Sequence, residues 1–252
     1  LRASAWNTHY APVSGTRTFA GNGFVILGPT VGRRSRGLEV VLERRRALHL
    51  AKLSWVLASS RERFTASAQR NIAFGGAGPP DTDTPAPDDR RHRLIAHVAR
   101  WTADTDGTPG WRRGWRADLL LRAESGAPYT PTLVFDEVTL AAVAAQPAGP
   151  AYSARLPWAS AFDLGLSREL GLRLLRWDAA LQVYNLFDRH NVAEVYSGTG
   201  RADETGWLET PDGQAYLSAV GQPGLGLFQL AQHNPSNWQP PRTMTLSVRA
   251  RW

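Results

Sequence analysis

The sequence predicts an all-β protein, and more specifically an antiparallel transmembrane β-barrel segment of about eight strands. Three observations lead to this fold class. Many segments alternate apolar and polar residues with a period of two, the repeat of a strand with two unlike faces. The polar faces carry many full charges, as a water-filled lumen would. The connections alternate in length, as long extracellular loops and short periplasmic turns do.

The clearest strand lies at the C-terminal end, over residues 242–252. Its apolar face consists of Met244, Leu246, Val248, Ala250 and Trp252. The intervening positions are threonine, serine or arginine, so the period of two is strict. The strand ends on an aromatic residue, and barrels place aromatic girdles at the membrane interfaces. An ordinary half-buried strand of a soluble sheet also alternates, so the charged face and the connections decide between the two interpretations.

The remaining strands follow from the same alternation and from the turn-forming residues between them. We expect strands at residues 1–10, 36–46, 49–59, 92–103, 113–123, 158–168, 174–187 and 241–252. Long loops rich in Gly, Pro, Asp and Asn are expected at 11–35, 60–90, 124–157 and 188–240. Short turns are expected at 45–49, 105–113 and 169–174, and a short helix at 139–145 inside its loop.

The charged positions of the strands predict a lumen wall. Candidate lumen-facing residues are Arg116, Asp118, Arg122, Asp163, Asp178, Arg249 and Arg251. The net charge is +7, but the arginines are spread along the chain and do not form the single basic patch of a nucleic-acid binder. No stretch approaches the ~20 consecutive apolar residues of a membrane helix, so a membrane-embedded form requires a barrel.

The residue pattern indicates no catalytic, cofactor or metal site. The chain has no cysteine, and its 6 histidines do not show metal-ligand spacing. Nucleophile-elbow, phosphate-loop and dinucleotide motifs do not occur. Carboxylates such as Glu39 and Glu43 share a strand face with arginines nearby, and we interpret them as lumen charges. We therefore predict that the protein is not an enzyme.

Aromatic residues in the long loops are the best candidates for contact with a ligand. They are Tyr152, Trp207, Tyr216, Phe228 and Trp238. Aromatic rings beside arginines suit sugars, peptides or anionic chelates, and the sequence does not select among these. The alternative is that the same rings pack within loops or anchor the protein at the membrane interface.

Several motifs at strand edges resemble those of TonB-dependent outer-membrane receptors. They run in the expected order from residue 89 to residue 252. The motifs are Asp89-Arg90-Arg91-His92, Ser125-Gly126-Ala127-Pro128-Tyr129-Thr130-Pro131, Asn185-Leu186-Phe187-Asp188 followed by Asn191, Tyr196-Ser197-Gly198-Thr199-Gly200, Asn234-Pro235-Ser236-Asn237-Trp238 and Pro240-Pro241-Arg242. Arg36-Gly37-Leu38-Glu39 resembles an earlier strand start. We interpret most of these residues as shaping the barrel rim, with Gly126 permitting a sharp exit and Asn185 and Asp188 satisfying backbone groups.

The resemblance implies the last third of a barrel of about 22 strands. Residues 1–252 would then be the C-terminal part of a receptor in the bacterial outer membrane, and the family's plug domain and signal peptide do not occur in this chain. The implied function is energised uptake of a scarce solute, a siderophore, glycan or peptide. The implied partners are outer-membrane lipid, lipopolysaccharide and an energy-coupling protein, without nucleic acid. The alternatives are a self-contained eight-stranded outer-membrane barrel and, less favoured, a soluble all-β carbohydrate-binding domain.

Overall fold

One antiparallel sheet dominates the computed structural model, which describes residues 1–252 except 19–24, 64–82, 104–108, 134–145, 173–174 and 252. Its main strands are β1 (Arg2–Thr18), β2 (Val25–Arg46), β3 (His49–Arg63), β5 (His92–Trp101), β6 (Trp115–Glu124), β9 (Ala159–Leu172), β10 (Leu175–Tyr184) and β11 (Thr243–Arg251). They pair in the order β1-β2-β3-β5-β6-β9-β10-β11, each with its neighbour along this series. The expected all-β, antiparallel architecture is confirmed, and every expected strand segment overlaps one of these strands.

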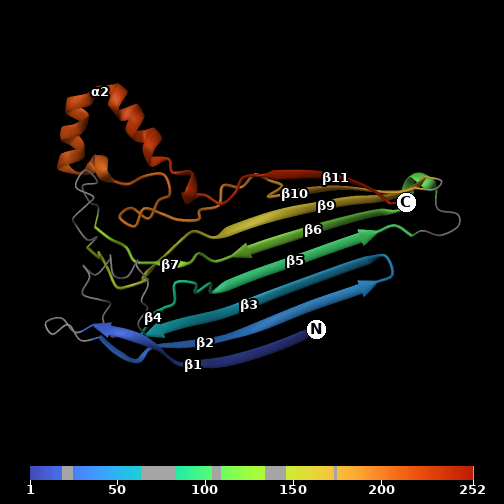
Figure 1. Ribbon diagram of the computed structural model, residues 1–252, viewed down its shortest axis with the longest axis horizontal. Coiled ribbons are helices and arrows are strands. Elements are labelled where there is room, and N and C mark those ends of the chain that lie inside the picture. The colour runs from blue at the N-terminus through green and yellow to red at the C-terminus, as the bar shows by residue number, and fades with distance from the viewer. Residues whose placement is uncertain (19–24, 64–82, 104–108, 134–145, 173–174, 252) are drawn as a thin grey trace.

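Most of the smaller elements in the described residues gather at one end of the sheet. β4 (Asp83–Pro85) pairs with β3, and β7 (Pro128–Tyr129) pairs with β8 (Ala154–Arg155) in a separate two-stranded sheet. The helical elements are η1 (Gly110–Arg112), η3 (Trp207–Glu209), α2 (Pro211–Gln232) and η4 (Pro235–Asn237). Figure 1 shows β4, β7 and α2 at the end where β3 finishes and β5 begins, and η1 at the opposite end. We call the end with β4, β7 and α2 the loop end, and the end with η1 the turn end.

The backbone register sorts the sheet into one apolar and one polar face. Opposite residues of neighbouring strands share a face, so pairs such as Leu119↔Leu164 and Leu181↔Leu246 join the apolar positions of successive strands. The apolar face runs without a break from β2 to β11 through these pairs. Each strand therefore contributes its alternate apolar residues to a single surface, as the period of two requires.

No second layer covers the apolar face of this sheet in the described part of the chain (Figure 1). Leu246 keeps 73% of its surface exposed, Met244 63% and Val98 50%. Other large apolar side chains exposed on this face are Leu38, Leu42, Leu53, Leu57, Leu119 and Val248. A soluble monomer rarely exposes so large a contiguous apolar surface, and such a surface marks an interface with lipid or with protein.

The hairpin of β1 and β2 extends well beyond the expected strand ends. The expected loop at 11–35 is wrong over most of its length, because β1 continues to Thr18 and β2 begins at Val25. Prolines and glycines in this stretch were interpreted as loop residues, but the ladder accommodates them through register shifts between Tyr10 and Val13 and between Val13 and Ser14. A bulge places an extra residue outside the regular ladder, which is where a strand tolerates proline.

Helix α2 was not expected within the 188–240 loop. Thr210 caps it by accepting a hydrogen bond from the Gly213 amide, and Pro211 begins its first turn. Gly221 then interrupts the helix with a positive φ of 61°, two residues before Pro223. Glycine and proline inside a segment are typical of a turn or loop, so the local pattern does not indicate this helix. No helix in the described residues is both long and apolar enough to cross a membrane. The helix expected at 139–145 lies outside the described residues.

Candidate functional site

The polar face of the sheet carries the residues that were predicted to line a lumen. The register places Arg116, Asp118, Arg122, Asp163, Asp178 and Arg249 on this one face. The backbone of Arg251 pairs with that of Arg176 on the same ladder. Their exposure to a barrel lumen stays a prediction.

Ion pairs connect neighbouring strands across the polar face. The Arg122 guanidinium donates to Asp163 at 2.6 Å, joining β6 to β9. The Asp118 carboxylate accepts from Arg116 at 2.8 Å and lies 3.2 Å from the His97 ring nitrogen, which joins β6 to β5. These contacts give the face a mixed charge pattern with fixed geometry, which suits a polar solute that binds through charge-assisted hydrogen bonds.

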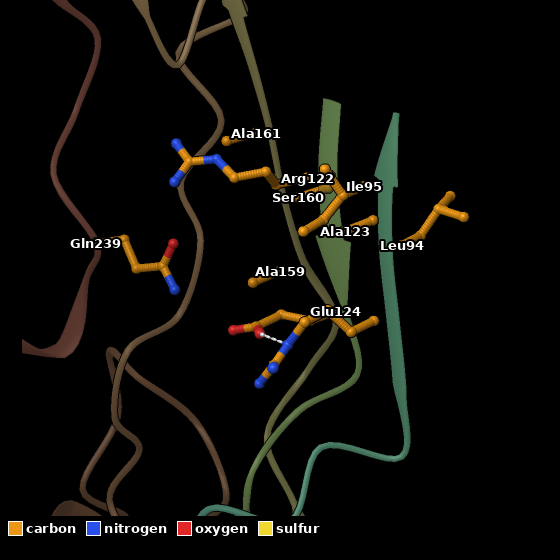
Figure 2. Close-up of a pocket in the computed structure, with 10 residues that line it drawn as sticks. Leu94, Ile95, Arg122, Ala123, Glu124, Ala159, Ser160, Ala161 and Gln239 are labelled. Carbon is orange, nitrogen blue, oxygen red and sulfur yellow. Dashed lines mark ion pairs between the residues drawn. The ribbon is translucent and has the colours of Figure 1, made fainter. Parts of the chain in front are cut away.

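A hollow of about 290 Å³ opens on the polar face near the loop end. Figure 2 shows Arg122 and Glu124 pointing into it, while Leu94 points to the other side of the sheet. Gln239, from the segment that leads into β11, lies across the hollow from the sheet. The Arg93 guanidinium lies 3.6 Å from the Glu124 carboxylate at its edge. The hollow thus offers both signs of charge and an amide to a polar solute.

A second hollow, of about 270 Å³, lies further along the same face. Its polar lining includes His97, Asp118, Asp163, Gln182 and Tyr184. Because Asp163 faces this hollow and binds Arg122 of the first, the two hollows share one network. We take both hollows together as the candidate site, and we call them the polar-face site.

Each carboxylate of the polar-face site is engaged by an arginine or histidine, so none is left in the described structure as a free general base. Within the described residues, no group of three or more His, Asp or Glu side chains is placed to hold a metal ion. The predicted absence of catalysis remains a prediction.

Sequence reasoning missed several residues of the polar-face site. Arg93 and His97 lie on β5, where the apolar Ile95 stands between them on the polar face and interrupts the alternation of apolar and polar residues. The register with β6 determines the face of both residues, because Arg93 lies opposite Glu124 and His97 opposite Leu120. Gln239 carries no sequence signal, because its position depends on how the long loop returns to the sheet.

The Asn-Leu-Phe-Asp motif closes the end of β10. Asn185 has a φ of 52° and its side chain binds the backbone of Arg189 in both directions, at 3.0 Å each. The Asp188 carboxylate accepts the Arg242 amide at 2.8 Å, and Asn191 binds the amide and carbonyl of Ser160 at 2.9 and 2.8 Å. The expected role of these residues in satisfying backbone groups at a strand end is confirmed.

The predicted loop aromatics lie in three separate places. Trp207, Tyr216 and Phe228 pack on one another, with ring centroids 5.0 to 6.3 Å apart, between η3 and α2. Trp207 is 3% exposed and Tyr152 is 5% exposed, so both are packed inside the loops in this arrangement. Trp238 is half-buried and lies edge-on to His190. Ligand contact by these five residues stays a prediction.

Gly126 is required by a close approach of two loops. A Cβ at this position would lie 1.7 Å from the Leu156 carbonyl oxygen, a backbone atom that cannot move aside alone. We expect Gly126→Ala to lower the free energy of unfolding by about 2 kcal/mol, the usual range for overpacking. Gly110→Ala is the matched control, since a Cβ there meets nothing within 4 Å. Denaturant unfolding of both variants measures the difference, and equal stabilities would contradict the close approach.

Comparison with known proteins identifies no family, since no family model matches the chain and no curated protein matches it.

Proposed function

We propose that this chain forms part of the wall of an outer-membrane β-barrel receptor for solute uptake. The observation that carries the proposal is the pairing of an exposed, uninterrupted apolar face with a charged, ion-paired face across one layer of antiparallel strands. Lipid would contact the first face and a water-filled passage the second. The strand-edge motifs that resemble TonB-dependent receptors support the receptor class.

The height of the apolar face fits a bilayer. On β2, Arg36 and Arg44 flank Leu38, Val40 and Leu42 on the same face. Those arginines are eight residues apart, which is about 26 Å along a strand at ~3.3 Å per residue. A strand tilt of about 40° reduces this to a height of roughly 20 Å, close to the ~25 Å apolar band of outer-membrane barrels. Flanking arginines would then meet the headgroups.

In this proposal the polar-face site contributes to selection and passage of the solute. Arg93, Arg122 and Glu124 present both charge signs beside Gln239, at the end of the sheet where the loops gather. A zwitterionic or anionic solute that enters between the loops would meet these groups first. Energised uptake would belong to the receptor as a whole, with a plug and an energy-coupling partner that the resemblance implies.

A cysteine scan along β11 tests the membrane assignment. The chain has no cysteine, so each single substitution gives a unique label. In phospholipid vesicles we expect probes at Met244, Leu246 and Val248 to be quenched by lipid-borne nitroxides. Probes at Thr245, Ser247 and Arg249 should instead react with water-soluble reagents, because they lie on the opposite face. Equal water access at all positions would reject the bilayer and favour a soluble β-domain.

The alternative, a self-contained eight-stranded barrel, differs from part of a larger barrel only in which strands pair with the two open edges of the sheet. β1 and β11 each pair with one neighbour in the described structure, so both present an open edge. In a larger barrel these edges pair with other strands, whereas in the small barrel they pair with each other. Cysteines at Ser4 and Ser247, on the polar face of β1 and β11, should crosslink in vesicles only in the small barrel.

A further inference from the structure

A basic hollow of about 480 Å³ lies at the loop end, away from the polar-face site. Three arginines from separate segments line it: Arg61 of β3, Arg91 just before β5, and Arg155 of β8. Asp83 also lines it and binds Arg61 at 2.9 Å, while Arg155 binds the buried Asp89. Arg91 forms no ion pair with any residue that the structure describes, so the lining has an excess positive charge.

An aromatic stack continues from this hollow onto the apolar face. The His92 ring lies between Trp55 and Trp158, with centroid distances of 6.1 and 5.6 Å and interplanar angles of 15° and 23°. His92 follows Arg91 directly, and Trp158 lies close in sequence to Arg155, so the same two segments supply the hollow and the stack. His92 aligns with Leu57, which is 38% exposed on the apolar face.

Further exposed arginines extend the basic surface beside the stack. Arg34 pairs in register with Arg61, and Arg36 lies two residues closer to the apolar band on the same face. Both are exposed, and their neighbours Leu38 and Leu57 are exposed apolar residues. Cations, stacked aromatics and aliphatic side chains therefore follow one another from the loop end towards the middle of the sheet. This order matches an amphiphile whose anionic head sits above its acyl chains.

We propose that the basic hollow binds the phosphorylated headgroup of an outer-leaflet lipid. Arg91 would hold a phosphate through charge-assisted hydrogen bonds, and Arg34 and Arg36 would bind a second phosphate or a neighbouring lipid. The acyl chains would lie along Trp158, Leu57 and Leu38. The inference rests on the proposed membrane location, and it adds a defined lipid site to it. A soluble anion would gain nothing from the adjoining aromatic and aliphatic surface.

Binding of diphosphoryl lipid A to the full chain in uncharged detergent micelles tests this site. We expect Arg91→Gln to weaken binding about tenfold and the Arg34→Gln/Arg91→Gln pair about a hundredfold, one charge-assisted contact per arginine. Arg189→Gln is the matched control, since this exposed arginine lies at the loop end of β10 and uses only its backbone in the Asn185 contacts. It should leave the affinity unchanged.

Two outcomes would overturn the lipid site. Unchanged affinity in the Arg34→Gln/Arg91→Gln variant would show that these arginines do not hold the headgroup. Free pyrophosphate binding as tightly as the lipid, with the same loss in Arg91→Gln, would indicate a site for soluble anions. Because the micelle assay does not require bilayer insertion, its failure is distinguishable from failure of the cysteine scan. If the cysteine scan shows lipid contact along β11 but the chain does not bind lipid A, the barrel proposal stands and the lipid site is rejected.

Discussion

Replacing Arg155 with methionine is expected to lower the free energy of unfolding by about 4 kcal/mol, within the range measured when one partner of a buried ion pair is removed. The remaining partner, Asp89, is only 3% exposed. Its carboxylate accepts the Ser60 amide at 2.6 Å and the Arg155 guanidinium, which also donates to the carbonyl oxygens of Asp89 and Gly126. Without Arg155, a buried carboxylate loses its only countercharge among the described residues.

The neighbouring pair Arg33–Asp88 supplies a matched control for this prediction. It has a comparable geometry, 2.8 Å between guanidinium and carboxylate, but Asp88 is 64% exposed at its side chain. Arg33→Met should therefore cost about 1 kcal/mol or less, as exposed pairs do. Denaturant unfolding of both variants measures the loss in the free energy of global unfolding. Amide hydrogen exchange at Ser60 measures local opening around Asp89, because the Ser60 N–H donates to the Asp89 carboxylate. An equal loss of stability in Arg155→Met and Arg33→Met would contradict the expectation that the buried pair contributes more than the exposed one.

The Arg155 contact also shows where sequence reasoning stops. The motif containing Asp89 marks a strand start, and the sequence places it correctly before β5. Its partner Arg155, however, lies 66 residues away in the two-residue strand β8. Nothing in the local pattern selects this arginine among the others, because the pairing depends on how two long loops pack together. For the same reason, the sequence gives no sign that Arg61, Arg91 and Arg155 line one hollow.

The strands themselves are predictable because their signal is local. In β6 and β11 each residue's face is determined by alternation alone, and the register with β9 and β10 preserves it. Prediction fails where a second constraint overrides the local signal. The prolines near Val13 and Ser14 are absorbed by register shifts, and Gly221 interrupts α2 two residues before Pro223. Gln239 reaches the polar-face site only through the return of the last loop.

On the apolar face, a membrane wall differs from a soluble sheet in how strongly a charge substitution lowers the free energy of unfolding. Leu246 is in the middle of β11, opposite Leu181, with 73% of its surface exposed. In water an exposed leucine can become arginine with little change, within about 0.5 kcal/mol. In a bilayer the same change places a charge near the midplane, which costs about 2–4 kcal/mol on the lipid face of a barrel. The two environments therefore predict clearly different stabilities.

Leu246→Arg is accordingly expected to lower the free energy of unfolding in phospholipid vesicles by about 3 kcal/mol. Ser247→Arg, one residue further and on the polar face, should change it by less than about 0.5 kcal/mol, because the lumen would hydrate the charge. Met244→Arg, nearer the loop end of β11, should cost less than Leu246→Arg, since the penalty falls towards the interface. A depth-dependent loss confined to one face would be difficult to explain by protein packing. Equal and small effects at Leu246 and Ser247 would mean that water covers both faces, and the receptor proposal would then have to be abandoned.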